Sequence, residues 1–248
     1  MLLVNVSAFW TSSLLGLLAG LANAAGGIIL VRRSPSTRSL RYFVALGAGF
    51  MLSAAMLEMV PEGLALNARW GPVLLLGGYC SMHLVEHTLV SHFHFGEESH
   101  PHHVVSLKTT SSVLLGLAVH TFFDGIAIGS GFILSNWLGW IIFFAIFLHK
   151  VPEGFTVASV MLAGGRGRKT AFSSALLLGV TTFLGVLAIN AAPTLVHLCL
   201  PLAAGVTIYV AASDLVPEVN REPGIRMALV FFGGVAIFLA LRSLGPAT

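Results

Sequence analysis

Two short stretches of the chain combine an imidazole with a carboxylate at the spacing of one helical turn. His120 precedes Asp124 by four residues, and His149 precedes Glu153 by four. On an α-helix this spacing places both side chains on one face. Two neutral imidazole nitrogens and two carboxylate oxygens suit Zn²⁺ and other first-row divalent ions. The alternative is a structural polar network between two helices, but two matched pairs favour a metal site.

The elements that must position these pairs are two apolar runs, at about 110–134 and 138–162, separated by the short link 135–137. Each run exceeds the roughly 20 apolar residues that cross a bilayer of about 30 Å. Each His lies about ten residues inside its run, near half depth. Helices joined by so short a link are expected to pack antiparallel, so the four side chains converge near the membrane midplane. A polar cluster there is costly unless it binds something.

The composition indicates an all-α membrane protein. Hydrophobic residues make up 56% of the 248 residues and charged residues 9%, whereas a soluble domain carries about 25% charged residues. Eight spans are expected, at about 8–31, 42–65, 72–92, 110–134, 138–162, 171–191, 196–217 and 226–244. The loops are short, so residues 1–248 are read as a single transmembrane domain without nucleic-acid partners. The two cysteines suggest no disulfide framework.

Loop charges predict the orientation in the bilayer. Most basic residues outside the spans fall on one side: Arg32, Arg33, Arg38, Arg41, Lys108, Arg166, Arg168, Lys169, Arg221 and Arg226. Only Arg69 and Arg242 stand on the other side. Because basic loops stay in the cytoplasm, both termini are expected outside. Short loops and the absence of targeting signals suggest a bacterial inner membrane, with an organelle membrane as the alternative.

A Val-Pro-Glu sequence occurs three times, at 60–62, 151–153 and 216–218. In spans two and seven a second acid, Glu58 or Asp214, stands four residues before the Glu. This echo predicts inverted three-helix repeats, spans 1–3 and 6–8, flanking the central pair 4–5. Each proline removes the hydrogen-bond partner of the carbonyl four residues earlier. A cation or water could take its place, or the helix simply kinks and neighbouring groups satisfy the carbonyl.

Further polar residues could line a route for cations. The candidates on spans two, three and seven are Glu58, Glu62, His83, Glu86, His87, Asp214 and Glu218. The acids of span two would attract ions outside, and those of span seven would receive them inside. The group on span three is either an exit route or a structural polar seam. A His-rich cytoplasmic loop at about 92–108 could bind metals weakly or be a solvated linker; its candidates are His92, His94, His100, His102 and His103.

The paired stretches resemble the fourth and fifth helices of ZIP (Zrt/Irt-like) metal transporters. The matching residues are His120, Asp124, Gly125, His149, Pro152, Glu153 and Gly154. Eight spans, outward termini and a His-bearing loop after span three match as well. The resemblance implies movement of Zn²⁺, Fe²⁺ and related ions into the cytoplasm by an elevator-like motion, and a homodimer.

Two residues depart from the family pattern. Thr121 stands where the family usually has Asn, and Lys150 where it usually has an acid that bridges a second metal. A buried ammonium beside two carboxylates could replace that second metal, so a single transport ion is expected. Lys150 could instead bind metal as a neutral amine or point away from the site.

The predicted function is therefore transport, with Zn²⁺ preferred and Fe²⁺, Mn²⁺ or Cd²⁺ able to use the same ligands. No nucleotide-binding motif is found, so ATP hydrolysis in this chain is not expected to drive it. Two other classes remain. One is a membrane-embedded zinc metalloenzyme using the segment His83-Leu84-Val85-Glu86-His87, and the other is a metal sensor. Both are ranked below transport, and no enzymatic activity is expected.

Overall fold

The computed structural model describes residues 6–32, 37–89, 107–220 and 225–244. Within these ranges the chain forms helices and no strands. The elements are α1 (Val6–Arg32), α2 (Thr37–Ala54), η1 (Ala55–Met59), α3 (Val60–Leu66), α4 (Gly71–Leu89), α5 (Leu107–Leu134), α6 (Asn136–Ala163), α7 (Arg168–Ala191), η3 (Pro193–Leu195), α8 (Val196–Tyr209), η4 (Val210–Leu215), α9 (Val216–Asn220) and α10 (Ile225–Ser243).

Seven of the eight expected spans are long and apolar enough to cross a membrane. The eighth, α4, has 19 residues and extends about 28 Å at 1.5 Å per residue. It carries the polar cluster of the third expected span near its C-terminal end. The all-helical membrane architecture is therefore confirmed, with seven or eight spans among the described residues.

A single residue separates α5 from α6. Ser135 is extended, with φ −159° and ψ 150°, and its Oγ accepts a hydrogen bond from the backbone N–H of Leu138 at 3.1 Å. This side-chain cap satisfies one of the free N–H groups at the start of α6. The chain reverses there, and α5 and α6 pack against each other. The two metal-ligand candidates on each helix are thereby held side by side.

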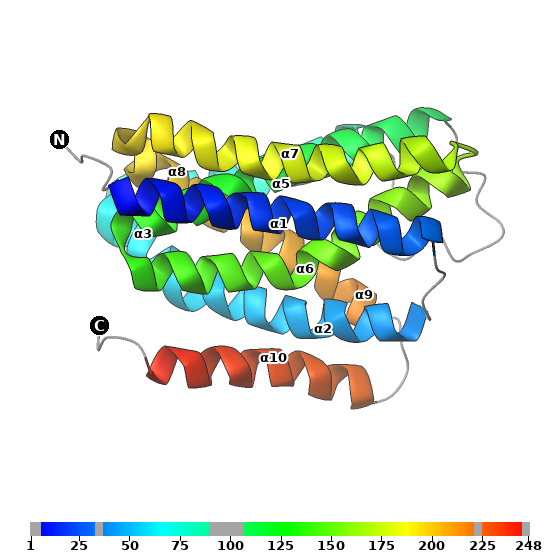
Figure 1. Ribbon diagram of the computed structural model, residues 1–248. Coiled ribbons are helices and arrows are strands. Elements are labelled where there is room, and N and C mark those ends of the chain that lie inside the picture. The colour runs from blue at the N-terminus through cyan, green and yellow to red at the C-terminus, as the bar shows by residue number, and fades with distance from the viewer. Residues whose placement is uncertain (1–5, 33–36, 90–106, 221–224, 245–248) are drawn as a thin grey trace.

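The helix contacts divide the elements into two groups, and Figure 1 shows α7 beside α1 and α10 beside α2. In the first group α1, α5, α6 and α7 pack against one another. In the second, α4 packs on α8 and α10 packs on α2. The groups meet mainly where α2 contacts α6 and where α5 contacts α8. The candidate ligands belong entirely to the first group.

Glycines directly after the two candidate acids allow the helices of the first group to approach closely. A Cβ at Gly125 would collide with the carbonyl oxygen of Thr182 on α7, and one at Gly154 with that of Asn23 on α1. Only hydrogen fits at these positions. The backbones carrying Asp124 and Glu153 are thus fixed against neighbouring helices.

Two of the three Val-Pro-Glu sequences follow a π-helical segment. In η1 the N–H of Val60 donates to the carbonyl of Ala55, and in η4 the N–H of Val216 donates to that of Ala211. The hydrogen bonds therefore span five residues in place of four, which is the register of a π-helix. The third sequence lies inside α6, which stays α-helical through Pro152. The expected disturbance at the prolines thus takes the form of a π turn in spans two and seven.

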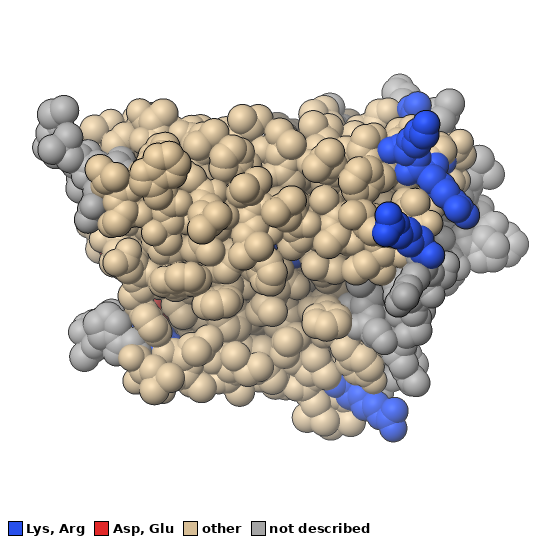
Figure 2. All heavy atoms as spheres, in the orientation of Figure 1, with Lys and Arg blue, Asp and Glu red and all other residues tan. Residues whose placement is uncertain are grey.

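Charge is concentrated at one end of the molecule. Figure 2 shows Lys and Arg side chains gathered where α1 ends and α7 begins, while the middle of that face carries almost none. The beginning of α1 and the end of α10 lie together at the opposite end (Figure 1). Both ends of the described chain therefore lie on one side, as an even number of spans requires.

Candidate metal site

Four metal-ligating side chains from α5 and α6 meet in the interior. One ligand atom each from His120, Asp124, His149 and Glu153 lie within 4.8 Å of one another. All four are buried, with exposed fractions between 1% and 3%. Each His/acid pair shares a helical face, and the short α5–α6 link brings the two faces together. The structure thus assembles the group whose spacing stood out in the sequence.

The two imidazoles point toward the same carboxylate oxygens. His120 Nε2 lies 3.2 Å from Asp124 Oδ2, and His149 Nε2 lies 3.3 Å from it. Glu153 Oε2 lies 3.9 Å from the first imidazole and 3.6 Å from the second. An ion placed among these atoms would need only small side-chain shifts to reach the bond lengths of about 2.0–2.2 Å typical of Zn²⁺.

The backbone orients one of the imidazoles. His149 Nδ1 lies 3.1 Å from the carbonyl oxygen of Ala145. A carbonyl oxygen only accepts, so Nδ1 carries a proton and donates a hydrogen bond, which makes Nε2, 3.3 Å from Asp124 Oδ2, the nitrogen that a metal would take in the neutral ring. That nitrogen faces Asp124 and Glu153. A second hydrogen bond of this kind fixes the ring orientation of metal-ligating histidines.

Lys150 occupies the centre of the same cluster. Its side chain is 0% exposed, and its Nζ donates to Asp124 Oδ2 at 2.6 Å and to Glu153 Oε2 at 2.7 Å. Of the three arrangements considered from the sequence, the one in which Lys150 points away from the site is wrong. Both short hydrogen bonds are those of an ammonium with two carboxylates.

Part of the hydrogen-bonding capacity of the site is unused. Asp124 Oδ1, Glu153 Oε1 and both nitrogens of His120 are buried without a hydrogen-bond partner among the described residues. Buried polar atoms are normally paired, because leaving one unpaired costs about 1–3 kcal/mol. The unpaired carboxylate oxygens and the unprotonated nitrogen of His120 can donate lone pairs, and a divalent cation would accept them.

Thr121, the other departure from the family pattern, is turned toward a different helix. Its Oγ1 lies 2.6 Å from Thr181 Oγ1 on α7 and donates to the carbonyl of Ala118 at 3.1 Å. A hydroxyl engaged in this way holds α5 against α7. The candidate ligands are therefore the two imidazoles and the two carboxylates, with the ammonium beside them.

Two candidates for the inner approach come together from different spans. Glu86 on α4 and Asp214 in η4 lie near each other, and Tyr209 Oη donates to Glu86 Oε2 at 2.9 Å. The rings of His83 and His87 lie beside them with centroids 4.0 Å apart. The span-three group is thus joined to span seven.

The candidates of span two are separate from this group. Glu58 is 9% exposed and its Oε1 accepts from Arg242 Nε on α10 at 2.9 Å. Glu62 is half-buried. The side chain of Glu218 and the loop histidines His92, His94, His100, His102 and His103 lie outside the described residues.

Sequence reasoning missed three residues near these groups. Asn23 on α1 is 0% exposed, and neither of its amide atoms has a partner among the described residues. Tyr209 and Arg242 pair with acids more than 100 positions away in the chain. Asn23 is a polar residue within an apolar run, so the sequence could have singled it out. The two pairings depend on which helices pack together, which local spacing does not reveal.

Comparisons with known proteins point to one family. The sequence profile of the ZIP Zinc transporter family matches residues 97–242, more than half of the chain. The chain is 28% identical to Zinc transporter ZIP9-B of Xenopus laevis over 86% of each protein. It is 34% identical to Zinc transporter ZIP9 of Micropogonias undulatus over 62% of this chain and 53% of that protein. Human Zinc transporter ZIP4 is 30% identical over 52% of this chain and 22% of its own length.

The profile match contains α5 and α6 with their buried His/carboxylate cluster, and its relatives are named for zinc transport. On its sequence and on this match, the chain belongs to the ZIP Zinc transporter family.

Proposed function

We propose that the protein carries Zn²⁺ across the membrane into the cytoplasm, and that His120, Asp124, His149 and Glu153 bind the ion in transit. One observation carries the proposal: four ligands suited to zinc converge within 4.8 Å in a buried position between two apolar helices. The names of the relatives support zinc as the ion. The same ligands would also hold Fe²⁺, Mn²⁺ or Cd²⁺.

Lys150 takes the place of a second metal in this proposal. Its ammonium lies 2.6 and 2.7 Å from the two carboxylates, where a second divalent ion would otherwise bridge them. A fixed cation at that point leaves ligands for one transported ion. We therefore assign one Zn²⁺ per chain.

The motion proposed is of the elevator type. The ligands all belong to the group α1, α5, α6 and α7, which contacts the remaining helices mainly through α2 and α8. Such a group could slide past the others and carry its ion from one face to the other. The concentration of Lys and Arg at one end (Figure 2) supports placing that end in the cytoplasm, with both termini outside.

The helix contacts support the inverted repeats on which such motions often rest. Exchanging spans one to three with spans six to eight, and span four with span five, maps the α1–α6 contact onto the α7–α5 contact. The same exchange maps α4–α8 onto α10–α2 and α2–α6 onto α8–α5, and all of these contacts are present. The π segments η1 and η4 are also exchanged, and each contains an acid, Glu58 or Asp214.

The acids of the two π segments, Glu58 and Asp214, would attract the ion on the outer side and receive it on the inner side. Glu58 lies toward the outer end of span two and would attract cations from outside. The neighbouring pair Glu86 and Asp214, with His83 and His87 beside it, would receive the ion on the inner side. The His-rich loop at about 92–108 would follow as a weak metal buffer.

The test is zinc uptake by purified protein in liposomes. We expect His120→Ala and His149→Ala to abolish time-resolved ⁶⁵Zn²⁺ uptake, because each removes a buried ligand. His197→Ala is the matched control, since His197 is exposed at the start of α8 and its Nδ1 donates to the backbone carbonyl of Thr194. Uptake that survives both ligand changes in folded protein would place the metal path elsewhere.

A further inference from the structure

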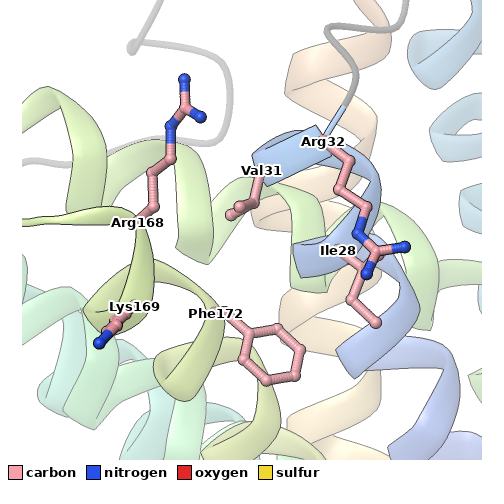
Figure 3. Close-up of a pocket in the computed structure, with 6 residues that line it drawn as sticks. All are labelled: Ile28, Val31, Arg32, Arg168, Lys169 and Phe172. Carbon is pink, nitrogen blue, oxygen red and sulfur yellow. The ribbon is translucent and has the colours of Figure 1, made fainter.

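A pocket of about 310 Å³ opens between the end of α1 and the start of α7 (Figure 3). Its wall is formed by six residues: Ile28, Val31, Arg32, Arg168, Lys169 and Phe172. Three of them are apolar, three are cationic and none is acidic. The pocket shares no residue with the metal site.

Helix contact explains why the pocket lies at this position. Closer to the middle of the membrane-spanning helices, Gly27 on α1 packs against Ala175 on α7. A Cβ on Gly27 would stand 2.7 Å from the alanine methyl. Toward the helix ends the small residues give way to Ile28 and Val31 on α1 and to Phe172 on α7. These larger side chains line the pocket.

The charged side chains stand around the opening. Arg32 is the last residue of α1 and Arg168 the first of α7, and both are exposed. Figure 3 shows their guanidinium groups on opposite sides of the pocket, with the ring of Phe172 at its base. None of the ion pairs found among the described residues includes Arg32, Arg168 or Lys169. No described carboxylate therefore neutralises these cations, and an anion would be attracted.

The apolar side of the pocket continues into surface that faces lipid. Leu21 on α1 is 54% exposed, and Leu176 and Leu177 on α7 are 42% and 44% exposed. In a spanning helix such side chains contact acyl chains. The cationic residues of the pocket would thus bind an anionic head group, and its apolar residues would contact an apolar tail of the same molecule.

We propose that this pocket binds an anionic phospholipid of the cytoplasmic leaflet. Its phosphate contacts Arg32, Arg168 and Lys169, and its acyl chains lie over Ile28, Val31 and Phe172. Basic pockets between spanning helices on the cytoplasmic side bind acidic head groups in this way. The lipid bridges α1 and α7, two helices of the group that holds the metal site. The inference stands whether or not the protein transports zinc.

Native mass spectrometry of the purified protein in mild detergent tests the proposal, with dioleoyl phosphatidylglycerol and dioleoyl phosphatidylcholine as probes. We expect the anionic lipid to bind with clear preference. The double variant Arg32→Gln/Arg168→Gln should weaken its binding about 30-fold, from about fivefold for each lost cation. Arg226→Gln is the matched control, because Arg226 is an exposed arginine at the start of α10 outside the pocket.

Three results would overturn the proposal. Equal binding of the two lipids would remove the role of charge. Equal weakening by the double variant and by Arg226→Gln would mean a diffuse attraction without a pocket. The third result is displacement of the lipid by free glycerol phosphate at the same concentration at which the lipid saturates the protein. The acyl chains would then contribute nothing to binding, and the pocket would be assigned to a soluble phosphate.

Discussion

Replacing Lys150 by Glu should change the number of zinc ions that the protein binds. With neutral imidazoles, two carboxylates and one ammonium give the empty site a net charge of −1, and one Zn²⁺ brings it to +1. In Lys150→Glu three carboxylates give −3, and two Zn²⁺ are needed to reach the same +1. We therefore expect one zinc per native chain and two per variant chain.

The stability of the metal-free variant should fall at the same time. Removing one partner of a buried ion pair costs about 3–5 kcal/mol, because the other charge is left uncompensated. Here two buried carboxylates lose their cation and a third is added. Zinc at about 100 times its dissociation constant returns about 2.7 kcal/mol for each site filled. The rise in unfolding temperature on adding zinc should therefore be larger in the variant than in the native protein.

Elemental analysis after equilibrium dialysis measures the stoichiometry, and thermal unfolding in detergent measures the stability. Lys169→Glu is the matched control, because it makes the same change of charge at an exposed lysine and should leave one zinc per chain. A folded Lys150→Glu variant that binds one zinc at saturation would refute the reasoning that the ammonium replaces a second metal.

Three further substitutions, one of them with a matched control, test other parts of the structure by thermal unfolding. Gly125→Ala should cost about 1–3 kcal/mol because its methyl group meets the α7 backbone, whereas Gly77→Ala, with open space around it, should gain up to about 1 kcal/mol; equal effects would contradict the close approach. Asn23→Leu should stabilise the protein by about 1–3 kcal/mol, since it removes two unpaired buried amide atoms, and a loss would indicate a partner for the amide. Arg242→Gln should cost about 1 kcal/mol, because the arginine paired with Glu58 is partly exposed; unchanged stability would argue against the pair.

The spans could be predicted from the sequence because the bilayer imposes their length and apolar character. α5 ends at Leu134 and α6 begins at Asn136, within two residues of the expected bounds 134 and 138. The agreement arises because Ser135 can cap a helix and the link is too short for another structure. The meeting of His120 with Glu153 followed from the same link. Local spacing was sufficient for that part of the site.

Other features depend on contacts that spacing does not encode. Local spacing places Glu153 within reach of Lys150 on the same helix, but the contact of Lys150 with Asp124 depends on how α5 packs against α6. The π segments were also missed, since a proline alone predicts a disturbed helix without saying how the hydrogen bonds rearrange. The pair of Glu58 with Arg242 requires knowing that α2 lies against α10.

The buried ammonium of Lys150 also determines how membrane voltage would act on a moving site. In the proposed cycle the loaded site carries +1 inward and the empty site carries −1 outward. A potential that is negative inside favours both movements, by about 2.3 kcal/mol per charge for each 100 mV crossed. Without the ammonium, the loaded site would be neutral and the empty one would carry −2, so voltage would act on the return alone. One lysine thus divides the electrical driving force equally between the two halves of the cycle.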